Sequence, residues 1–167
     1  MFQETELTDL SFNPFTKIGD EWMLITAGNK EKCNTMTASW GGLGVLWNKN
    51  VSFIFLRPQR YTLEFLEKEE YYSLCFFDES QRKTLNYCGS HSGRDVDKAK
   101  ETGLTTVYDG SVPYFEEARC VLICRKLYGQ MMEPSCFTNP SVEQKNYPNK
   151  DYHKMFVGEI VKVLKKV

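Results

Sequence analysis

Residues 21–40, EWMLITAGNKEKCNTMTASW, carry the first clear sign of the fold. The run from Glu21 to Ala27 is strand-like, and it stops at Gly28-Asn29, a residue pair typical of turns. The segment from Cys33 to Trp40 follows soon after and is rich in Thr and Ser. We therefore expect two consecutive β-strands here.

Strand-like runs continue through the rest of the chain. They are short apolar stretches, several of them β-branched or aromatic, and they lie at Val45–Trp47, Val51–Leu56, Tyr71–Phe77, Arg119–Leu127 and Met155–Leu164. About seven short strands predict a mainly β protein, built as a β-barrel or curled sheet rather than as alternating strands and helices. No G-x-G-x-x-G motif follows a strand, so a Rossmann dinucleotide site is not indicated.

Helices are expected to be few and short. In the last of the three candidates, Asp95–Glu101, Ser92 is expected to cap the N-terminus, with Asp95 reaching back as in a capping box. Gly103 is expected to end this helix. The three candidate helices are Thr62–Glu69, Glu79–Cys88 and Asp95–Glu101.

Length and charge narrow the class of protein. A chain of 167 residues fits one domain, expected to span residues 1–167, and can bury a core without disulfide or metal staples. With 21 basic and 22 acidic residues the net charge is -1, which gives no sign of nucleic-acid or membrane-surface binding. No run approaches the ~20 apolar residues of a membrane span, and Met1–Asp9 lacks the apolar region of a signal peptide. We expect a cytoplasmic protein.

The cysteines and histidines do not suggest a metal site or a disulfide framework. None of the six cysteines belongs to a C-x-x-C pair, and Cys120 and Cys124 are expected on one strand, too far apart for a disulfide. The two histidines, His91 and His153, are far apart in sequence. We expect free thiols in a reducing compartment and no bound metal.

The segment Asn34-Thr35-Met36-Thr37-Ala38-Ser39-Trp40-Gly41-Gly42 is the first candidate for chemistry. It belongs to a stretch that has no charged residue from Cys33 through Asn48. Small side chains let a flat ligand approach the strand, where backbone N–H and C=O groups can bond to its heteroatoms. The alternative is an ordinary buried polar strand that hydrogen-bonds its neighbours.

Two further segments favour an anion. In Arg57-Pro58-Gln59-Arg60-Tyr61-Thr62, two arginines bracket a turn beside a predicted helix start, and guanidinium groups match a phosphate. Thr62 could cap that helix or donate its hydroxyl proton to the anion. Ser90–Lys98 is another loop with hydroxyls, a glycine and basic residues before a helix. Capped helix starts with solvated basic side chains are the alternative for both.

Four motifs in this order resemble one known family. NTMTASW (34–40), RPQRYT (57–62), CGSHSGRDVDK (88–98) and DYHKMFVGEI (151–160) are similar to the flavin reductase-like family, which has the FMN-binding split-barrel fold and includes flavoredoxins. The resemblance runs from Asn13-Pro14-Phe15 to Ile160. It implies a split β-barrel that forms a homodimer, with FMN bound near the subunit interface.

The resemblance also implies which residues surround the FMN. The strand Asn34–Ser39 would lie along the isoalloxazine ring, with its backbone at the ring edge. His91 stands where many relatives have Lys or Ser, so it is not expected to be a ligand. Arg57, Arg60, Tyr61 and Thr62 would hold the phosphate or its surroundings, Ser92, Arg94 and Lys98 would lie near the phosphate and ribityl end, and His153 and Glu159 would belong to the C-terminal pocket wall.

Two functions fit this resemblance. The first is an NAD(P)H-dependent flavin reductase, in which NADH or NADPH passes a hydride to flavin N5 and no catalytic side chain is needed. The second is an electron carrier like flavoredoxin, which keeps its FMN and exchanges electrons with a redox protein partner. The sequence does not separate these two, and an FMN-sensing or purely structural barrel that has lost turnover is a third possibility. Split-barrel oxidases of the pyridoxamine-phosphate type share the architecture, but the motifs fit the reductase-like branch better.

Overall fold

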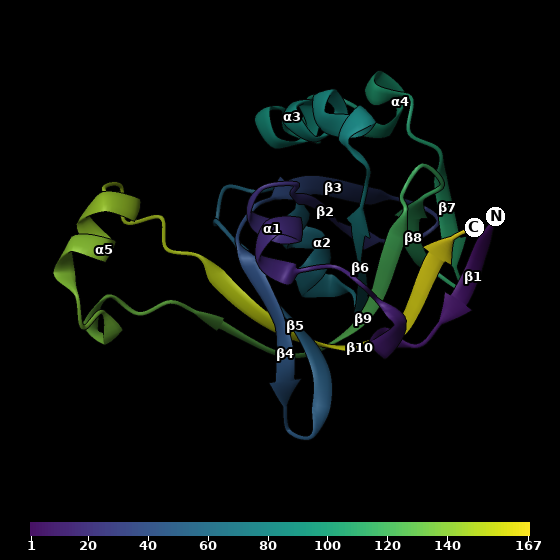
Figure 1. Cartoon of the computed structure of the whole chain (residues 1–167). Coiled ribbons are helices and arrows are strands. Elements are labelled where there is room, and N and C mark those ends of the chain that lie inside the picture. The colour runs from purple at the N-terminus through teal and green to yellow at the C-terminus, as the bar shows by residue number, and fades with distance from the viewer.

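The computed structural model describes residues 1–167 and shows one large antiparallel sheet with a few short helices (Figure 1). The sheet follows the order β3-β2-β6-β9-β10-β5-β4, and β1 also pairs with β10. A separate hairpin is formed by β7 and β8. The strands are β1 (Phe2–Thr5), β2 (Met23–Gly28), β3 (Cys33–Ala38), β4 (Gly41–Leu46), β5 (Lys49–Leu56), β6 (Tyr71–Phe76), β7 (Thr106–Asp109), β8 (Val112–Phe115), β9 (Cys120–Met131) and β10 (Lys154–Lys166).

The sheet curls back on itself and stays open at one seam. Strands β3 and β4 are the two ends of the hydrogen-bonded order, yet only Ser39 and Trp40 separate them in sequence. A flat sheet would hold these ends roughly 29 Å apart at the usual strand spacing, whereas so short a link spans roughly 10 Å. The sheet is therefore rolled, and the seam between β3 and β4 leaves an open edge on β3.

Side chains on both faces of the central strands are buried, which explains the unbroken apolar runs in the sequence. On β9, Leu122 and Cys124 join the core cluster that contains Leu63 and Leu66 of α2 (Thr62–Lys68). Val121 and Ile123 alternate with them and join a second core under α3 (Arg82–Ser90). Because side chains alternate along a strand, the sheet separates two cores.

The predicted helix after Ser92 begins later than expected. The helix α4 (Lys98–Thr102) has Asp97 as its N-cap, whose carboxylate accepts the Lys100 N–H at 3.1 Å. The prediction of Ser92 as the cap is wrong, because Ser92 Oγ accepts the Arg94 N–H at 3.2 Å in the preceding turn. Gly103 ends the helix with φ of 73°, as expected. The prediction missed α1 (Pro14–Gly19) and α5 (Pro140–Asn146), although each begins with an Asn N-cap followed by a proline.

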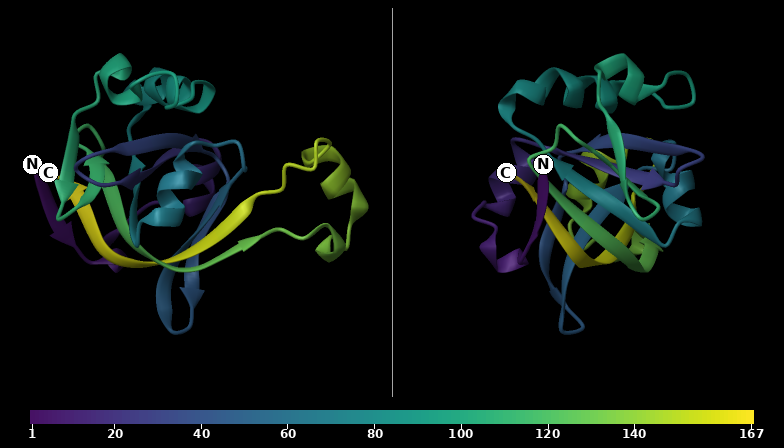
Figure 2. Two further views of the ribbon diagram at one scale, coloured as in Figure 1. Left: turned by 180° about the vertical axis from the view of Figure 1, so that it is seen from behind. Right: turned by 90° about the vertical axis from the view of Figure 1, so that its right-hand side faces the viewer.

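Strands β9 and β10 continue beyond the barrel into an arm, defined here as residues 132–153. The arm carries α5 and projects away from the barrel (Figure 2). At its root the Met132 N–H donates to the His153 carbonyl at 2.9 Å. At the opposite side of the molecule the two chain ends meet, where the Val167 N–H donates to the Met1 carbonyl at 3.1 Å.

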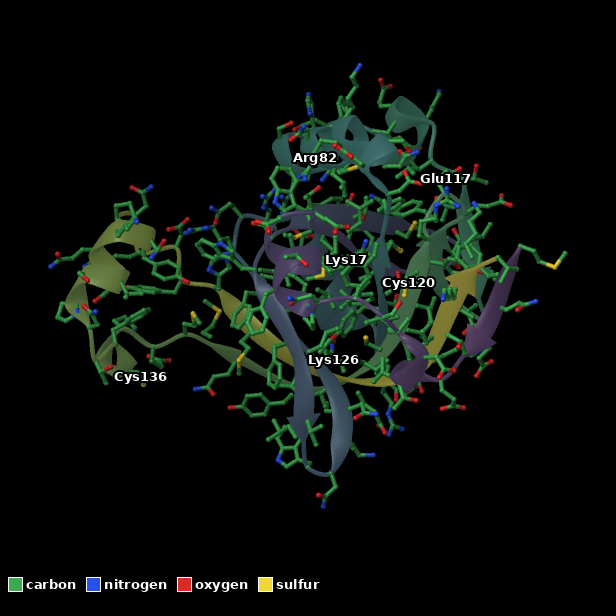
Figure 3. The ribbon with its side chains drawn as sticks, viewed as in Figure 1. Lys17, Arg82, Glu117, Cys120, Lys126 and Cys136 are labelled. Atoms are coloured by element: carbon green, nitrogen blue, oxygen red, sulfur yellow. The ribbon has the colours of Figure 1, made fainter.

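All six cysteines are free. Cys120 and Cys124 both lie on β9, as expected from their spacing, and Cys136 lies far away on the arm (Figure 3). Burial raises the pKa of the Cys75 and Cys124 thiols to about 12, which keeps both protonated near neutral pH. None of the helices is both long and apolar enough to pass through a lipid bilayer.

Candidate functional site

The open edge of β3 offers unpaired backbone groups. The strand pairs only with β2, and on its free side Lys98 Nζ donates to the Thr35 carbonyl at 2.8 Å. In an antiparallel ladder alternate residues direct both backbone groups to the same edge, so Thr37 faces that side as well. The uncharged strand thus presents backbone donors and acceptors at the seam.

The corner Arg57–Thr62 packs directly against this strand. The Asn34 side-chain amide donates to Thr62 Oγ1 at 2.9 Å, and both residues are buried. Thr62 does not cap α2, because Tyr61 occupies the N-cap position and makes no capping bond. The Thr62 hydroxyl accepts this bond and donates none within the chain.

Two adjoining cavities follow the junction between β3 and the corner, and together they form the site groove. The first, of about 240 Å³, is lined by residues 36–40, Phe55 and His153. The second, of about 320 Å³, is lined by residues 59–62, residues 89–93 and Lys98. The two share Met36, Arg57 and Arg60 as lining residues.

Two basic side chains in the site groove lack an acidic partner. Lys98 exposes only 5% of its surface, and its ammonium donates to the carbonyls of Thr35 and Cys88, at 2.8 and 2.7 Å. The Arg60 guanidinium donates to the Gly89 carbonyl at 2.8 Å. Burial lowers the pKa of Lys98 to about 8 and also lowers the pKa of Arg60. Buried cations without counter-charges are costly, so the second cavity is suited to an anion.

Two other predicted cations already have partners. The Arg57 guanidinium lies 2.9 Å from the Asp151 carboxylate and donates to the Asn146 carbonyl, also at 2.9 Å. It therefore anchors the arm to the site groove. Arg94 pairs with Glu64 and lies over the Tyr61 ring at 4.6 Å, so it fixes the outside of the corner.

The turn before α4 fits closely against β3. A Cβ atom on Gly93 would lie 1.8 Å from Asn34 Oδ1, so only glycine allows this approach. Ser92 lines the second cavity beside it. The exposed His91 ring stacks on Tyr87 with centroids 3.9 Å apart.

His153, the last residue of the arm before β10, lines the first cavity. It exposes 7% of its surface, and its Nδ1 lies 2.7 Å from the Tyr147 hydroxyl. Burial, helped by the nearby Arg57 charge, lowers the pKa of His153 to about 4, so the ring is neutral near pH 7. Glu159 lies outside both cavities, where Lys49 and Arg125 each approach it to 2.8 Å.

The site groove gathers most, but not all, of the predicted residues. Asn34, Thr35 and Arg94 line a third cavity of about 630 Å³, and Lys98 lines both this cavity and the groove. The predicted residues in the groove are Met36, Thr37, Ala38, Ser39, Arg57, Arg60, Tyr61, Thr62, Ser92, Lys98 and His153.

The sequence-based prediction missed Phe55, and it placed Trp40 in the candidate segment without assigning it to the FMN site; both residues line the first cavity. Phe55 precedes Arg57 by two residues at the end of β5, and residues at that spacing share one face of a strand. Trp40 lies within the uncharged stretch, directly after Ser39. Both signals were present in the sequence, but neither separates a cavity wall from a core position.

The family model described as "Flavin reductase like domain" matches residues 16–166. The solved flavoredoxin from Methanosarcina acetivorans has a TM-score of 0.68 at 22% identity, covering 98% of this chain and 76% of that chain. The FMN-binding protein from Thermus thermophilus with bound p-hydroxybenzaldehyde has a TM-score of 0.68 at 22% identity, with 98% and 79% covered. An NADH:FAD oxidoreductase from Streptomyces globisporus has a TM-score of 0.64 at 16% identity, with 87% and 75% covered.

No curated protein sequence matches the chain. At these identities the solved structures show a shared fold. They confirm the expected mainly β architecture of the split-barrel type.

Proposed function

Since this chain belongs to the flavin reductase-like family, we propose that it is an FMN-binding oxidoreductase whose cofactor lies in the site groove. One observation carries the proposal: Arg60 and Lys98 are desolvated cations without acidic partners, and they border a strand edge with free backbone groups. A phosphate supplies the missing negative charge, and a flat heteroaromatic ring suits the uncharged edge. FMN joins these two features in one molecule.

The two cavities divide the cofactor between them. Arg60, Lys98, Thr62 and Ser92 would hold the phosphate in the second cavity. The backbone of residues 36–39 would contact the ring in the first cavity, where Trp40 and Phe55 contribute apolar wall. We assign Asn34 a supporting role, since it holds Thr62 in place. Arg57, Tyr61 and Arg94 likewise shape the corner through their own partners.

The reaction we propose is reduction of the bound flavin by NADH or NADPH. When bound, the flavin supplies the hydride-accepting atom N5, so the chain itself needs no acid or base for this step. The protein binds and orients, and backbone N–H groups on the edge of β3 stabilise negative charge that develops on the ring. We therefore assign no catalytic side chain.

A second candidate function is an electron carrier that retains its FMN. The buried Lys98 and the half-buried Arg60 favour it, because a site that holds two cations without counter-charges binds a phosphate tightly and releases it slowly. The similarity to a solved flavoredoxin is consistent with this candidate. Such a protein would exchange electrons with a redox protein partner rather than turn over free flavin.

The deciding experiment uses absorption spectra of the purified protein under anaerobic conditions. We expect a yellow protein whose visible absorption bleaches when NADH or NADPH is added. Steady nicotinamide consumption with excess FMN supports the reductase. Bleaching only by another reduced protein, with FMN retained through gel filtration, supports the carrier. A protein that takes up neither FMN nor riboflavin contradicts both.

We also propose that the whole chain is one domain that forms a homodimer. Strands β1 and β10, from opposite ends of the sequence, pair within one sheet.

Exposed apolar side chains gather where the β4–β5 hairpin approaches β9: Trp47 is 53% exposed, Tyr128 is 41% exposed, and their ring centroids are 6.3 Å apart. Light scattering coupled to gel filtration tests this, and a mass near 19.4 kDa contradicts the dimer.

A further inference from the structure

Tyr147 of the arm does not line the site groove itself, but its hydroxyl is hydrogen-bonded to His153, which does. Tyr147 follows α5 and is buried against Phe137 and Tyr152, with ring centroids 5.8 and 5.0 Å away. The Arg57 guanidinium lies over its ring at 5.1 Å. This packing holds the Tyr147 hydroxyl in place, 2.7 Å from His153 Nδ1.

We propose that Tyr147 is a positioning residue that holds His153 as a neutral imidazole with its proton on Nε2, so that His153 offers the groove a hydrogen-bond donor. The ligand that receives this bond, an acceptor atom of a flavin ring, rests on the proposed function. The tautomer itself does not depend on that function.

The tautomer follows from the partners of the Tyr147 hydroxyl. It has one proton and two acceptors within reach, His153 Nδ1 at 2.7 Å and Met132 Sδ at 3.4 Å. A thioether sulfur is a weak acceptor, whereas an unprotonated imidazole nitrogen is a strong one. The hydroxyl therefore donates to Nδ1. The ring proton must then lie on Nε2.

Nε2 is the nitrogen that faces the cavity. It has no hydrogen-bond partner in the chain, yet the buried polar side-chain atoms without a partner are only Arg125 Nε and Asp151 Oδ1. Nε2 therefore keeps accessible surface. Because His153 lines the first cavity beside Trp40 and Phe55, that surface opens into the site groove.

The charges around His153 keep this donor neutral. Burial disfavours a second proton on the ring, the charges of Arg57 and Arg60 act in the same direction, and only Asp151 opposes them. Asp151 is itself paired with Arg57. The donor should therefore be present without a change of charge across the neutral pH range. A neutral donor selects a ligand atom with a lone pair and leaves the phosphate to Arg60 and Lys98.

The test uses nitrogen-15 NMR of the two histidine rings in the unloaded protein at neutral pH. We expect His153 to show the pattern of a neutral ring protonated at Nε2, and His153→Gln identifies its signals against those of the exposed His91. Tyr147→Phe should remove the fixed pattern and let the ring average between tautomers. Tyr152→Phe is the matched control, because its hydroxyl bonds to Glu143 and not to His153.

A second measurement is the affinity for FMN. His153→Leu, which removes the donor, should weaken binding by roughly 2- to 10-fold, and His153→Gln, which keeps an amide donor, should restore most of it. A ring protonated at Nδ1, or doubly protonated at neutral pH, overturns the proposal. So does a Tyr147→Phe spectrum identical to wild type. If the tautomer is as expected but FMN does not bind, the proposed function fails and the role of Tyr147 stands.

Discussion

Lys98 should make FMN binding depend on pH above neutrality. Its ammonium bonds only to carbonyl oxygens, and burial lowers its pKa from the ordinary 10.5 to about 8. A phosphate in the second cavity would supply a counter-charge and raise this pKa again. Binding near pH 7 leaves the proton on Lys98 in both states. Binding above pH 8 must take up a proton, because part of the free protein has lost it.

The magnitude follows from the linkage between proton and ligand binding. FMN affinity should be flat near pH 7 and should fall by up to tenfold per pH unit between about pH 8 and about pH 9. The lowered pKa corresponds to about 3 kcal/mol, at 1.36 kcal/mol per pH unit, and a phosphate that restores the ordinary pKa returns about this much. The same shift stabilises the unloaded protein as pH rises from about 8 toward 10.5, because the unfolded chain then binds more protons.

The assay is a fluorescence titration with FMN and, separately, with riboflavin, which has the ring but no phosphate. Wild type should show the pH dependence with FMN and not with riboflavin. Lys98→Met should bind FMN more weakly near pH 7 and lose the dependence. Lys100→Met is the matched control, since Lys100 lies on the same helix but is exposed and lies outside the site groove.

A flat FMN affinity in wild type from about pH 7 to about pH 9 would refute this reasoning. The same slope in Lys98→Met, or with riboflavin, would also refute it. Either result would mean that another group titrates, or that the phosphate does not approach Lys98.

Three shorter predictions concern other parts of the site and the core. Arg60→Ala should weaken FMN binding by on the order of 2–3 kcal/mol, while riboflavin affinity changes little; unchanged FMN affinity would remove Arg60 from the site. Gly93→Ala should lower the thermal unfolding temperature and FMN affinity together, because its Cβ would lie 1.8 Å from Asn34 Oδ1; wild-type values for both would contradict the close approach. Tyr72→Phe removes the hydroxyl that lies 2.8 Å from Ser52 Oγ in the core, so urea unfolding should show a loss of about 1–2 kcal/mol with unchanged FMN affinity.

Burial on both faces made the central strands readable from sequence. All six residues of β2 are buried, as are the first five of β9, so each appears as an apolar run that ends at polar or turn residues. The strands that were missed, β1, β7 and β8, are four residues long each. A strand this short leaves too little alternation to detect, and its pairing depends on partners far away in sequence.

The local signals at helix ends were less reliable than the strand pattern. Ser92 and Asp97 are both good N-cap residues, and both precede a helical stretch. The structure uses Asp97 because the turn at Gly93 is held against Asn34, which delays the start of α4. That contact joins residues from distant segments, so no local motif could have predicted it.

The distinction between Arg57 and Arg60 shows most clearly what sequence reasoning cannot supply. The two lie three residues apart, and both looked like phosphate ligands. Arg57 is neutralised by Asp151, which comes 94 residues later in the chain, whereas Arg60 finds only a carbonyl oxygen. Burying a cation without a counter-charge lowers the stability of the fold unless a bound anion compensates for the lost hydration. A cation that the fold leaves unpaired in a cavity is therefore a stronger sign of an anionic ligand than a cation in a motif, and here Arg60 and Lys98 meet that condition while Arg57 and Arg94 do not.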